Sequence, residues 1–523
     1  MKAHHLGVCS AIIAAIFTTG SWSATVDFGV KGSAALADED IPTSPPSGTQ
    51  GVFGPAVYWP IIPLHLVLLP DGTTMSYGTN MNGAQKGMLI EHWNPKLGTV
   101  ASAHTVSPNG VKTDFFCSGH TVISKTGETL ITGGDKTIDH VRNYSNADTN
   151  FYNYLDGTVR PGAKMAFKRW YPTLVTMADG KVVTLGGRSG INPSTFANTP
   201  EIWTPGEPAF KALYGATNAT AYGGGPGQAW FYPRCSAAPN GLLFCLTHKG
   251  AAYWMGPGGP NGNGFSVKIG GLVAPEGDAS LPSLTYAPGK ILSARNGGKV
   301  VTIDLNGMTP VMKEVAPLSQ ARYWANATVL ADGKVLVSGG AVGINKLQGV
   351  ANHIEIWNPL TGQWIIGASA KKPRLYHSTA LLLPDATVLT GGGGAPGPVD
   401  NLNAEIYYPP YLYLRDGTGN PAPRPTITNA PNVITWGGAA KAFFVSYTST
   451  RPISRVTFVR TGAATHSFNS DQRLIDLNIQ QRVNAGTLLV DSPKWSVNAP
   501  PGFYMMFIID NYGTPSRAKI IRM

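Results

Sequence analysis

Four side chains in this sequence are of types that bind metals, transfer protons or undergo oxidation: one thiol, two phenols and one imidazole. Each stands nine or ten residues before the turn of a short hairpin pattern. The four residues are Cys117, Tyr171, Tyr376 and His377. Equivalent offsets predict equivalent places in a repeated fold, so these groups are expected to meet if the repeats surround a common centre.

The hairpin pattern behind these offsets is an apolar segment, a turn with glycine, a second apolar segment and often Gly-Gly. Seven copies follow one another, and their turns are 44 to 61 residues apart. The turn positions are Gly72, Gly127, Gly180, Gly241, Gly289, Gly333 and Ala386. This period suits four-stranded propeller blades of the kelch type. Further strands are supplied by "EHWNPKLG", "EIWTPG", "EIWNPLTGQW" and "EIYYPPYL", so we expect a seven-bladed kelch-type β-propeller over residues 49–415.

In a propeller, corresponding ends of the innermost strands converge around the central channel. One Cys, two Tyr and one His are therefore expected to share one end of that channel. After the Pro-rich segment "YLYLRDGTGNPAPRP" the repeat stops, and longer strand patterns such as "RVTFVRTG" and "GFYMMFIID" follow. They predict an immunoglobulin-like β-sandwich over residues 416–523.

The composition agrees with an all-β protein. Gly and Pro number 63 and 41 while only 13% of the residues are charged, which favours short strands and tight turns over long amphipathic helices. The net charge is +11, but the basic residues are scattered and form no Lys/Arg run that could follow a phosphate backbone. No nucleic-acid partner is expected.

Residues 1–23 have a basic Lys2, a short apolar stretch and small residues at the end, as in a removable export signal. An uncleaved anchor is the alternative, although the apolar run is short for spanning a membrane. Residues 24–48 then form an N-terminal leader. We expect a secreted or periplasmic protein, with no membrane span after the signal is removed.

Export leaves three cysteines in an oxidising compartment. Cys235 and Cys245 flank an Asn-Gly turn and are expected to form a disulfide within one hairpin. Cys117 is left over, and it is either a buried inert thiol or chemically committed elsewhere.

The motifs around these residues resemble those of the galactose oxidase and glyoxal oxidase family of copper radical oxidases. This chain carries "FFCSGHTV", "KRWYPTLV", "RLYHSTALLLPD" and, in its C-terminal part, "AATHSFNSDQRLIDL" with His466. The four motifs occur in the family's order, and the resemblance covers nearly all of the mature chain. It implies a propeller followed by a sandwich that contributes one metal ligand.

Carried over residue by residue, the resemblance implies one copper ion bound by Tyr171, Tyr376, His377 and His466. It also implies a thioether bond between Cys117 and the ring of Tyr171, which would be held as a radical. Imidazole and phenolate ligands suit a tetragonal Cu(II) centre, and Tyr376 would act as general base. The implied activity is oxidation of a primary alcohol or aldehyde hydrate by O2, giving H2O2.

One family feature is missing. In galactose oxidase a tryptophan that stacks on the cross-linked tyrosine follows the second motif's Gly-Gly, where this chain reads "GGRSGIN". Trp324 stands nine residues before Gly333 and is the first candidate for that shield or for the substrate mouth, followed by Trp230 and Trp170. "RWYPT" is closer to the glyoxal oxidase side of the family.

The remaining histidines, including His65 and His120, are interpreted as structural. Galactose, glyoxal, methylglyoxal, glycerol and a polymer end are all compatible substrates, and we expect a monomer. A kelch glycan-binding or scaffold protein without catalytic activity is the alternative, and copper content separates the two.

Overall fold

The structure is a computed structural model that describes residues 41–138, 141–190, 195–225 and 229–523. The expected signal at residues 1–23 and most of the leader lie outside the described residues. In the part that is described, regular structure is almost entirely strand, and the two α-helices, α1 (Ser47–Gln50) and α2 (Ala219–Tyr222), span one turn each. None of the helices in these ranges is long and apolar enough to cross a membrane. The all-β prediction is confirmed.

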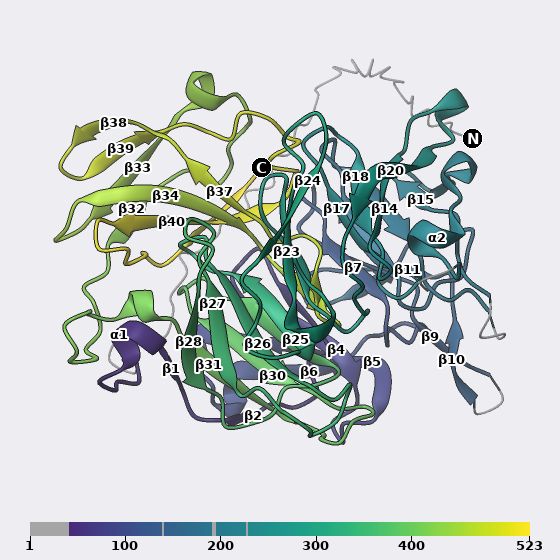
Figure 1. Cartoon of the computed structure of the whole chain (residues 1–523), viewed down its shortest axis with the longest axis horizontal. Helices are drawn as coiled ribbons and strands as arrows, with labels where there is room; N and C mark the ends of the chain where they lie inside the picture. Colours follow the sequence, from purple (N-terminus) through teal and green to yellow (C-terminus); the bar gives the residue numbers. More distant parts are fainter. Residues whose placement is uncertain (1–40, 139–140, 191–194, 226–228) are drawn as a thin grey trace, which may run out of the picture.

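Seven blades, six of four strands and one of five, make up most of the fold, and the repeats predicted seven (Figure 1). Blades 1 and 2 contain β3 (His65–Leu68), β4 (Thr74–Thr79), β5 (Gln85–Trp93) and β6 (His104–Pro108), then β7 (Gly119–Val122), β8 (Thr129–Thr132), β11 (Thr149–Tyr152) and β12 (Val159–Pro161). Blades 3 and 4 contain β13 (Thr173–Thr176), β14 (Val182–Leu185), β15 (Glu201–Trp203) and β16 (Lys211–Ala212), then β17 (Arg234–Ala237), β18 (Leu243–Leu246), β19 (Ala251–Gly256) and β20 (Phe265–Val273). Blades 5 and 6 contain β21 (Ser283–Ala287), β22 (Lys290–Ala294), β23 (Val300–Asp304) and β24 (Val311–Val315), then β25 (Tyr323–Val329), β26 (Val335–Ala341), β27 (His353–Trp357) and β28 (Trp364–Ser369).

Blade 7 closes the ring with strands from both ends of the propeller. It consists of β29 (Ser378–Leu382), β30 (Val388–Gly392) and β31 (Asn403–Tyr408), with β1 (Val52–Phe53) and β2 (Val57–Tyr58) paired to β31. The innermost strands of neighbouring blades contact one another, for example β25 with β29 and β29 with β3. Because the N-terminal strands complete the last blade, backbone hydrogen bonds hold the ring closed.

A two-stranded hairpin and short 3-10 turns decorate the blades. The hairpin is β9 (Asp135–Ile138) with β10 (Val141–Ser145), and it projects from the propeller at the lower right of Figure 1. The 3-10 turns are Pro95–Leu97, Ala101–Ala103, Tyr214–Ala216, Pro260–Gly262, Asn296–Gly298, Pro410–Leu412 and Gly438–Lys441.

The C-terminal region is a sandwich of two four-stranded sheets. The sheets are β32 (Thr426–Asn429), β33 (Phe443–Thr448), β39 (Thr487–Val490) and β38 (Ile479–Asn484), and β37 (Leu474–Leu477), β34 (Ile453–Arg460), β40 (Phe503–Asp510) and β41 (Lys519–Arg522). Alternate residues such as Val456 and Phe458 on β34 and Tyr504 and Ile508 on β40 fill the space between the sheets. The predicted immunoglobulin-like architecture is confirmed.

A hairpin of the C-terminal region enters the propeller channel. It consists of β35 (Ala463–Thr465) and β36 (Phe468–Asn469). Strand β35 pairs antiparallel with β3, with Thr465 opposite His65, and β36 pairs with β21 at Ser283. The hairpin therefore bridges blades 1 and 5, and its tip, which carries His466, points toward the end of the channel where the innermost strands begin.

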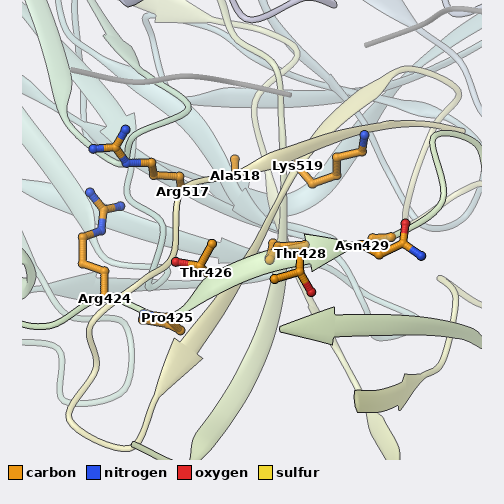
Figure 2. Close-up of a pocket in the computed structure, with 10 residues that line it drawn as sticks. Arg424, Pro425, Thr426, Thr428, Asn429, Arg517, Ala518 and Lys519 are labelled. Atoms are coloured by element: carbon orange, nitrogen blue, oxygen red, sulfur yellow. The ribbon is translucent and has the colours of Figure 1, made fainter. Parts of the chain in front are cut away.

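The sandwich packs on the opposite end, where the first and second strands of each blade turn. Arg424 donates to the carbonyl oxygens of Asp385, a turn residue of blade 7, and of Ser516 in the sandwich, at 2.7 and 2.9 Å. Figure 2 shows Arg424 at the edge of a small hollow of about 260 Å³ that Arg517 and Lys519 also line. The sandwich therefore covers one end of the channel. The tip of the β35–β36 hairpin lies at the opposite end.

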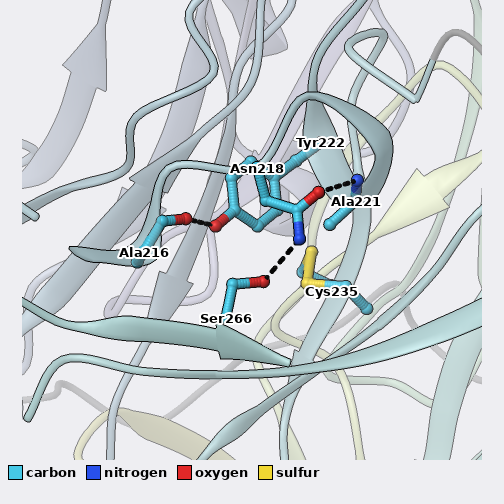
Figure 3. The surroundings of a disulfide bond; sticks show 7 residues. Ala216, Asn218, Ala221, Tyr222, Cys235 and Ser266 are labelled. Carbon is cyan, nitrogen blue, oxygen red and sulfur yellow. Dashed lines mark hydrogen bonds between the residues drawn. A yellow bond between two sulfur atoms is a disulfide. The ribbon is translucent and has the colours of Figure 1, made fainter. Parts of the chain in front are cut away.

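Cys235 and Cys245 form the predicted disulfide within blade 4. They are direct cross-strand partners on β17 and β18, and their Cα atoms are 4.1 Å apart. Figure 3 shows the polar contacts beside it, where Asn218 accepts from the Ala221 N–H and donates to Ser266 Oγ. The bond ties together the two innermost strands of this blade.

Candidate metal centre

The residues that open five of the innermost strands share an unusual backbone conformation. Their φ angles are 57° at Cys117, 68° at Tyr171, 38° at Tyr232, 64° at Trp324 and 65° at His377. Left-handed φ is unfavourable for residues with a Cβ atom and tends to occur at functional sites. The shared conformation turns each of these side chains into the same end of the channel.

The hairpin turns explain the two offsets seen in the sequence. In blade 3 the Gly180 N–H donates to Met177 O, whereas in blade 2 the Gly127 N–H donates to Ile123 O, so the turn of blade 2 is one residue longer. Cys117 is therefore the structural equivalent of Tyr171 and His377, although its offset is ten rather than nine. Tyr376 is the residue before the equivalent position.

Buried Arg–Glu pairs hold three of these strand openings in place. Arg169, two residues before Tyr171, donates to Glu201 at 3.0 Å and to the carbonyl oxygen of Gly186 at 2.8 Å. Gly186 has φ 66°, and a Cβ atom there would lie 2.4 Å from Pro233. The same pattern recurs as Arg322 with Glu355 and Arg374 with Glu405. This arrangement explains both the Gly-Gly motif and the "EIW" and "EIY" echoes, whose glutamates bind these arginines.

His377 presents a free Nε2 atom, and among the described residues the Nε2 atom of His466 contacts only the Cys117 thiol. His377 Nδ1 donates to Gly394 O at 2.7 Å, and its buried Nε2 has no hydrogen-bond partner among the described residues. His466 Nδ1 lies 2.6 Å from Thr465 Oγ1, and its Nε2 lies 3.8 Å from Cys117 Sγ. Hydrogen bonding at Nδ1 fixes the tautomer in which Nε2 carries the lone pair, as in metal-binding histidines.

Burial keeps both imidazoles neutral. It lowers the pKa of His377 to about 3, against the opposing effect of the Gly394 carbonyl. Burial also lowers the pKa of His466 well below its usual value, with a further contribution from His377. A neutral imidazole is the form that coordinates a metal, so no proton has to leave these two groups on binding.

The two tyrosines and the cysteine complete the cluster. Tyr171 and Tyr376 share a hydrogen bond of 2.9 Å between their hydroxyl groups. The backbone N–H of Tyr171 donates to Cys117 O at 2.9 Å, and the Cys117 thiol is fully buried and hydrogen-bonded to the Tyr171 side chain. Burial is the main cause that raises the pKa of the Tyr171 and Tyr376 phenols and of the thiol.

The structure therefore brings together all five residues that the sequence placed in one site. Cys117 Sγ and one ring nitrogen each of His377 and His466 lie within 4.8 Å of one another. One imidazole Nε2 without a protein partner and a second that contacts only the thiol, beside two phenols, make a donor set that suits Cu(II). The residues present thus fit a copper ion, with His377 and His466 pre-oriented for it.

Aromatic rings surround Tyr171, and two of the three candidate tryptophans, Trp170 and Trp230, are among them, with centroids at 4.1 and 6.0 Å. Trp170 and Phe231 lie against it, with ring centroids at 4.1 and 4.2 Å. Trp324, the first candidate for this cover, instead packs on Tyr376 at 4.2 Å and lies 6.1 Å from Phe231. Trp324 lies at the start of blade 6, next to blade 7, and therefore contacts Tyr376 rather than Tyr171.

The offset rule could also have identified Tyr232, which opens blade 4 nine residues before Gly241. Its ring lies 4.6 Å from that of His466, and its hydroxyl donates to Ser118 O at 2.9 Å. His65 and His120 lie deeper in the channel, with ring centroids 5.0 Å apart. No sequence signal places them there, because their neighbours come from separate blades.

Comparison with known proteins agrees with this geometry. Residues 424–523 match the family described as Galactose oxidase-like, Early set domain. The chain is 28% identical to a galactose oxidase of Gibberella zeae, over 92% of this chain and 72% of that protein. It is 26% identical to aldehyde oxidase GLOX of Vitis pseudoreticulata, over 81% of this chain and 84% of that protein.

A solved structure shares the fold. It is a fungal alcohol oxidase of the AA5 family in complex with copper, and it superimposes with a TM-score of 0.79 at 24% sequence identity. The match covers 91% of this chain and 100% of that one. The arrangement of propeller and C-terminal sandwich is therefore that of a known oxidase fold.

Proposed function

Since the chain belongs to the galactose oxidase and glyoxal oxidase family of copper radical oxidases, we propose that it oxidises a primary alcohol or aldehyde hydrate with O2, giving H2O2. The observation that carries this proposal is the convergence of Cys117, Tyr171, Tyr376, His377 and His466 in one buried cluster. A glycan-binding or scaffold protein has no need of two neutral buried histidines whose Nε2 atoms lie beside a thiol and two phenols.

In this proposal Tyr171, Tyr376, His377 and His466 hold one copper ion. When bound, the copper supplies one of the two electron acceptors needed for a two-electron alcohol oxidation, and O2 finally takes both electrons and both protons as H2O2. The second acceptor is the Tyr171 ring joined to Cys117 through sulfur. A sulfur substituent makes the ring easier to oxidise than an ordinary tyrosine.

Each side chain then has a separate task. Tyr376 accepts the hydroxyl proton of the substrate as general base. Its hydroxyl lies 2.9 Å from that of Tyr171, so both phenols can contact one substrate molecule. The oxygen of the oxidised Tyr171 accepts the hydrogen atom from the substrate carbon and becomes the phenol hydroxyl again. Trp170 and Phe231 cover that ring and limit access of water to it.

We also propose that the protein is exported and acts as a monomer on small alcohols, aldehydes or carbohydrates. Trp324 lies on Tyr376, so it is placed to line the substrate mouth beside the base. Trp170 on the cross-linked ring is the "RWYPT" tryptophan, which favours a substrate range closer to glyoxal oxidase than to a hexose specialist.

The test is a peroxide-coupled assay of copper-loaded and copper-free protein on galactose, glyoxal, methylglyoxal and glycerol. Copper-loaded protein should form peroxide with at least one of them, and the Tyr376→Phe variant should lose turnover while keeping its fold. A chain that binds copper yet forms no peroxide on any of these substrates would contradict the proposal and favour a binding protein.

A further inference from the structure

A hollow lined by lysines lies beside the β9–β10 hairpin. It has a volume of about 720 Å³, within the usual range for ligand sites. Lys86 of β5, Lys112 before β7, and Lys164 and Lys168 before β13 line it together with Lys136 of β9. These five lysines come from four separate segments and are all exposed. This clustering explains why no basic run is visible in the sequence.

The charges in this hollow do not balance. Six cationic and three acidic side chains line it. Arg142 is occupied by Asp114 and Asp135, at 2.9 and 2.6 Å, and Lys164 lies 3.5 Å from Asp148.

The other lysines have no such partner. Lys86, Lys112 and Lys168 form no ion pair with any residue in the described ranges. The acidic groups are therefore already paired, and an excess of positive charge faces the open hollow.

Ser145 also lines this hollow, and its buried hydroxyl group has no partner among the described residues. The residue is 2% exposed. Buried polar atoms are nearly always paired in folded proteins. Ser145 therefore places an unpaired hydroxyl in the wall of the hollow, beside the uncompensated lysines.

The hollow adjoins the metal centre through a thin wall. Asp114 accepts from the backbone N–H of Phe116 at 3.0 Å, and the Phe116 ring lies edge-on to His377 with centroids 5.6 Å apart. On the other side, Arg188 donates to Asn143 O of the hairpin and lies over Trp170 at 4.3 Å. A ligand in the hollow therefore lies next to the open end of the channel.

We propose that this hollow binds an acidic polysaccharide, through the carboxylates that repeat along a uronate-containing chain. Lysines from several segments can meet anionic groups at several points, and the exposed hydroxyl of Thr137 suits a sugar hydroxyl. No Phe, Tyr or Trp lines the hollow, although nucleic-acid bases and peptide partners are usually held by aromatic side chains. The site goes beyond the proposed oxidase chemistry and needs no bound metal.

The test is calorimetric titration of the copper-free full chain with an oligogalacturonide of defined length. The fully methyl-esterified oligomer is the matched neutral ligand. The triple variant Lys86→Gln/Lys112→Gln/Lys168→Gln removes three charges from the hollow, and Lys268→Gln/Lys299→Gln/Lys313→Gln removes three exposed charges from blades 4 and 5. Both variants lose the same net charge, so only the position of the lysines differs.

The parent should bind the acidic oligomer and not the ester, and its affinity should fall on going from about 50 to about 300 mM salt. The hollow variant should bind about tenfold more weakly, and the distant variant should bind as the parent does. Restoring the three charges as arginine should restore binding.

Equal losses in both variants, or equal binding of the ester, would overturn the proposal. Tighter binding of a single-stranded DNA or polyglutamate chain of equal charge would overturn it as well. A sulfated galactan oligomer tells whether the hollow prefers sulfate or carboxylate groups. The proposal requires that this oligomer bind no better than the uronate oligomer. Since no turnover is measured, the oxidase proposal can stand or fall separately.

Discussion

Removing the hydroxyl group beside His466 should weaken copper binding without removing a ligand. Thr465 Oγ1 lies 2.6 Å from His466 Nδ1 and also donates to Leu64 O at 3.0 Å. Thr465→Val keeps the shape of the side chain. It leaves the Nδ1–H of a residue that is only 1% exposed without this partner, so the ring is free to turn or to change tautomer.

The magnitude follows from the burial of the contact. Loss of a partner that orients a metal-binding histidine typically costs 10–100-fold in affinity, or about 1.4 to 2.7 kcal/mol. The unpaired Nδ1–H should also lower the free energy of unfolding of the metal-free protein by about 1–3 kcal/mol. Because only one ligand is disturbed, some binding should remain.

Competition with a chelator measures the copper affinity, and Thr457→Val is the matched control. Thr457 is a buried threonine of the same region that donates to the propeller at Ala331 O, 2.9 Å away, but its hydrogen bond does not involve a histidine. The control should lose stability and keep the parent's copper affinity. Equal copper affinity in parent and Thr465→Val, or equal loss in both variants, would refute the role given to His466.

Three other substitutions test separate parts of the structure. Phe231→Leu should shorten the lifetime of the oxidised, radical-bearing protein more than Trp324→Leu, because Phe231 contacts the cross-linked ring directly; optical decay measures this, and the reverse order would contradict it. Replacing Cys235 and Cys245 by alanine should lower the free energy of unfolding by about 2 to 3 kcal/mol at unchanged copper content, and unchanged denaturant midpoints would contradict this. Burial lowers the pKa of His120 to about 3, so between about pH 6.5 and 3 only the unfolded chain takes up this proton, and the folded protein loses stability as the pH falls. His120→Phe should therefore reduce the slope of unfolding free energy against pH in this range by up to about 1.4 kcal/mol per pH unit. Parallel stability curves for parent and variant would contradict this.

The sequence was most informative where the pattern is local. Hairpins with a glycine turn predicted the seven blades, and an Asn-Gly turn predicted the Cys235–Cys245 bond, because neighbours in sequence decide these features. The offset of Cys117 was harder to interpret, since one extra turn residue moved it by one position. Equivalent positions are better counted from the strand that precedes the turn.

Contacts between blades were not predictable in the same way. Trp324 and Tyr171 have the same offset, yet the order of the blades around the ring puts Trp324 against Tyr376. Phe231 stands directly before Tyr232, at the same place in its blade as Tyr376, yet the offset does not tell that it lies against Tyr171. The entry of His466 into the channel came from resemblance alone, because strand pairing of β35 with β3 joins segments about four hundred residues apart.

The central claim, a copper radical site built on Tyr171, is tested most directly by the state of Cys117. The proposed bond would join Sγ to a ring carbon of Tyr171, with loss of the S–H and ring C–H hydrogens to O2. Copper-loaded, aerated protein is denatured, its disulfide is reduced, and free thiols are alkylated before peptide mass analysis; protein kept free of copper is the control. We predict that Cys117 escapes alkylation and that its peptide is joined to that of Tyr171, lighter than the sum of the two by two hydrogen atoms. A fully alkylated Cys117 in the copper-loaded protein would contradict the account.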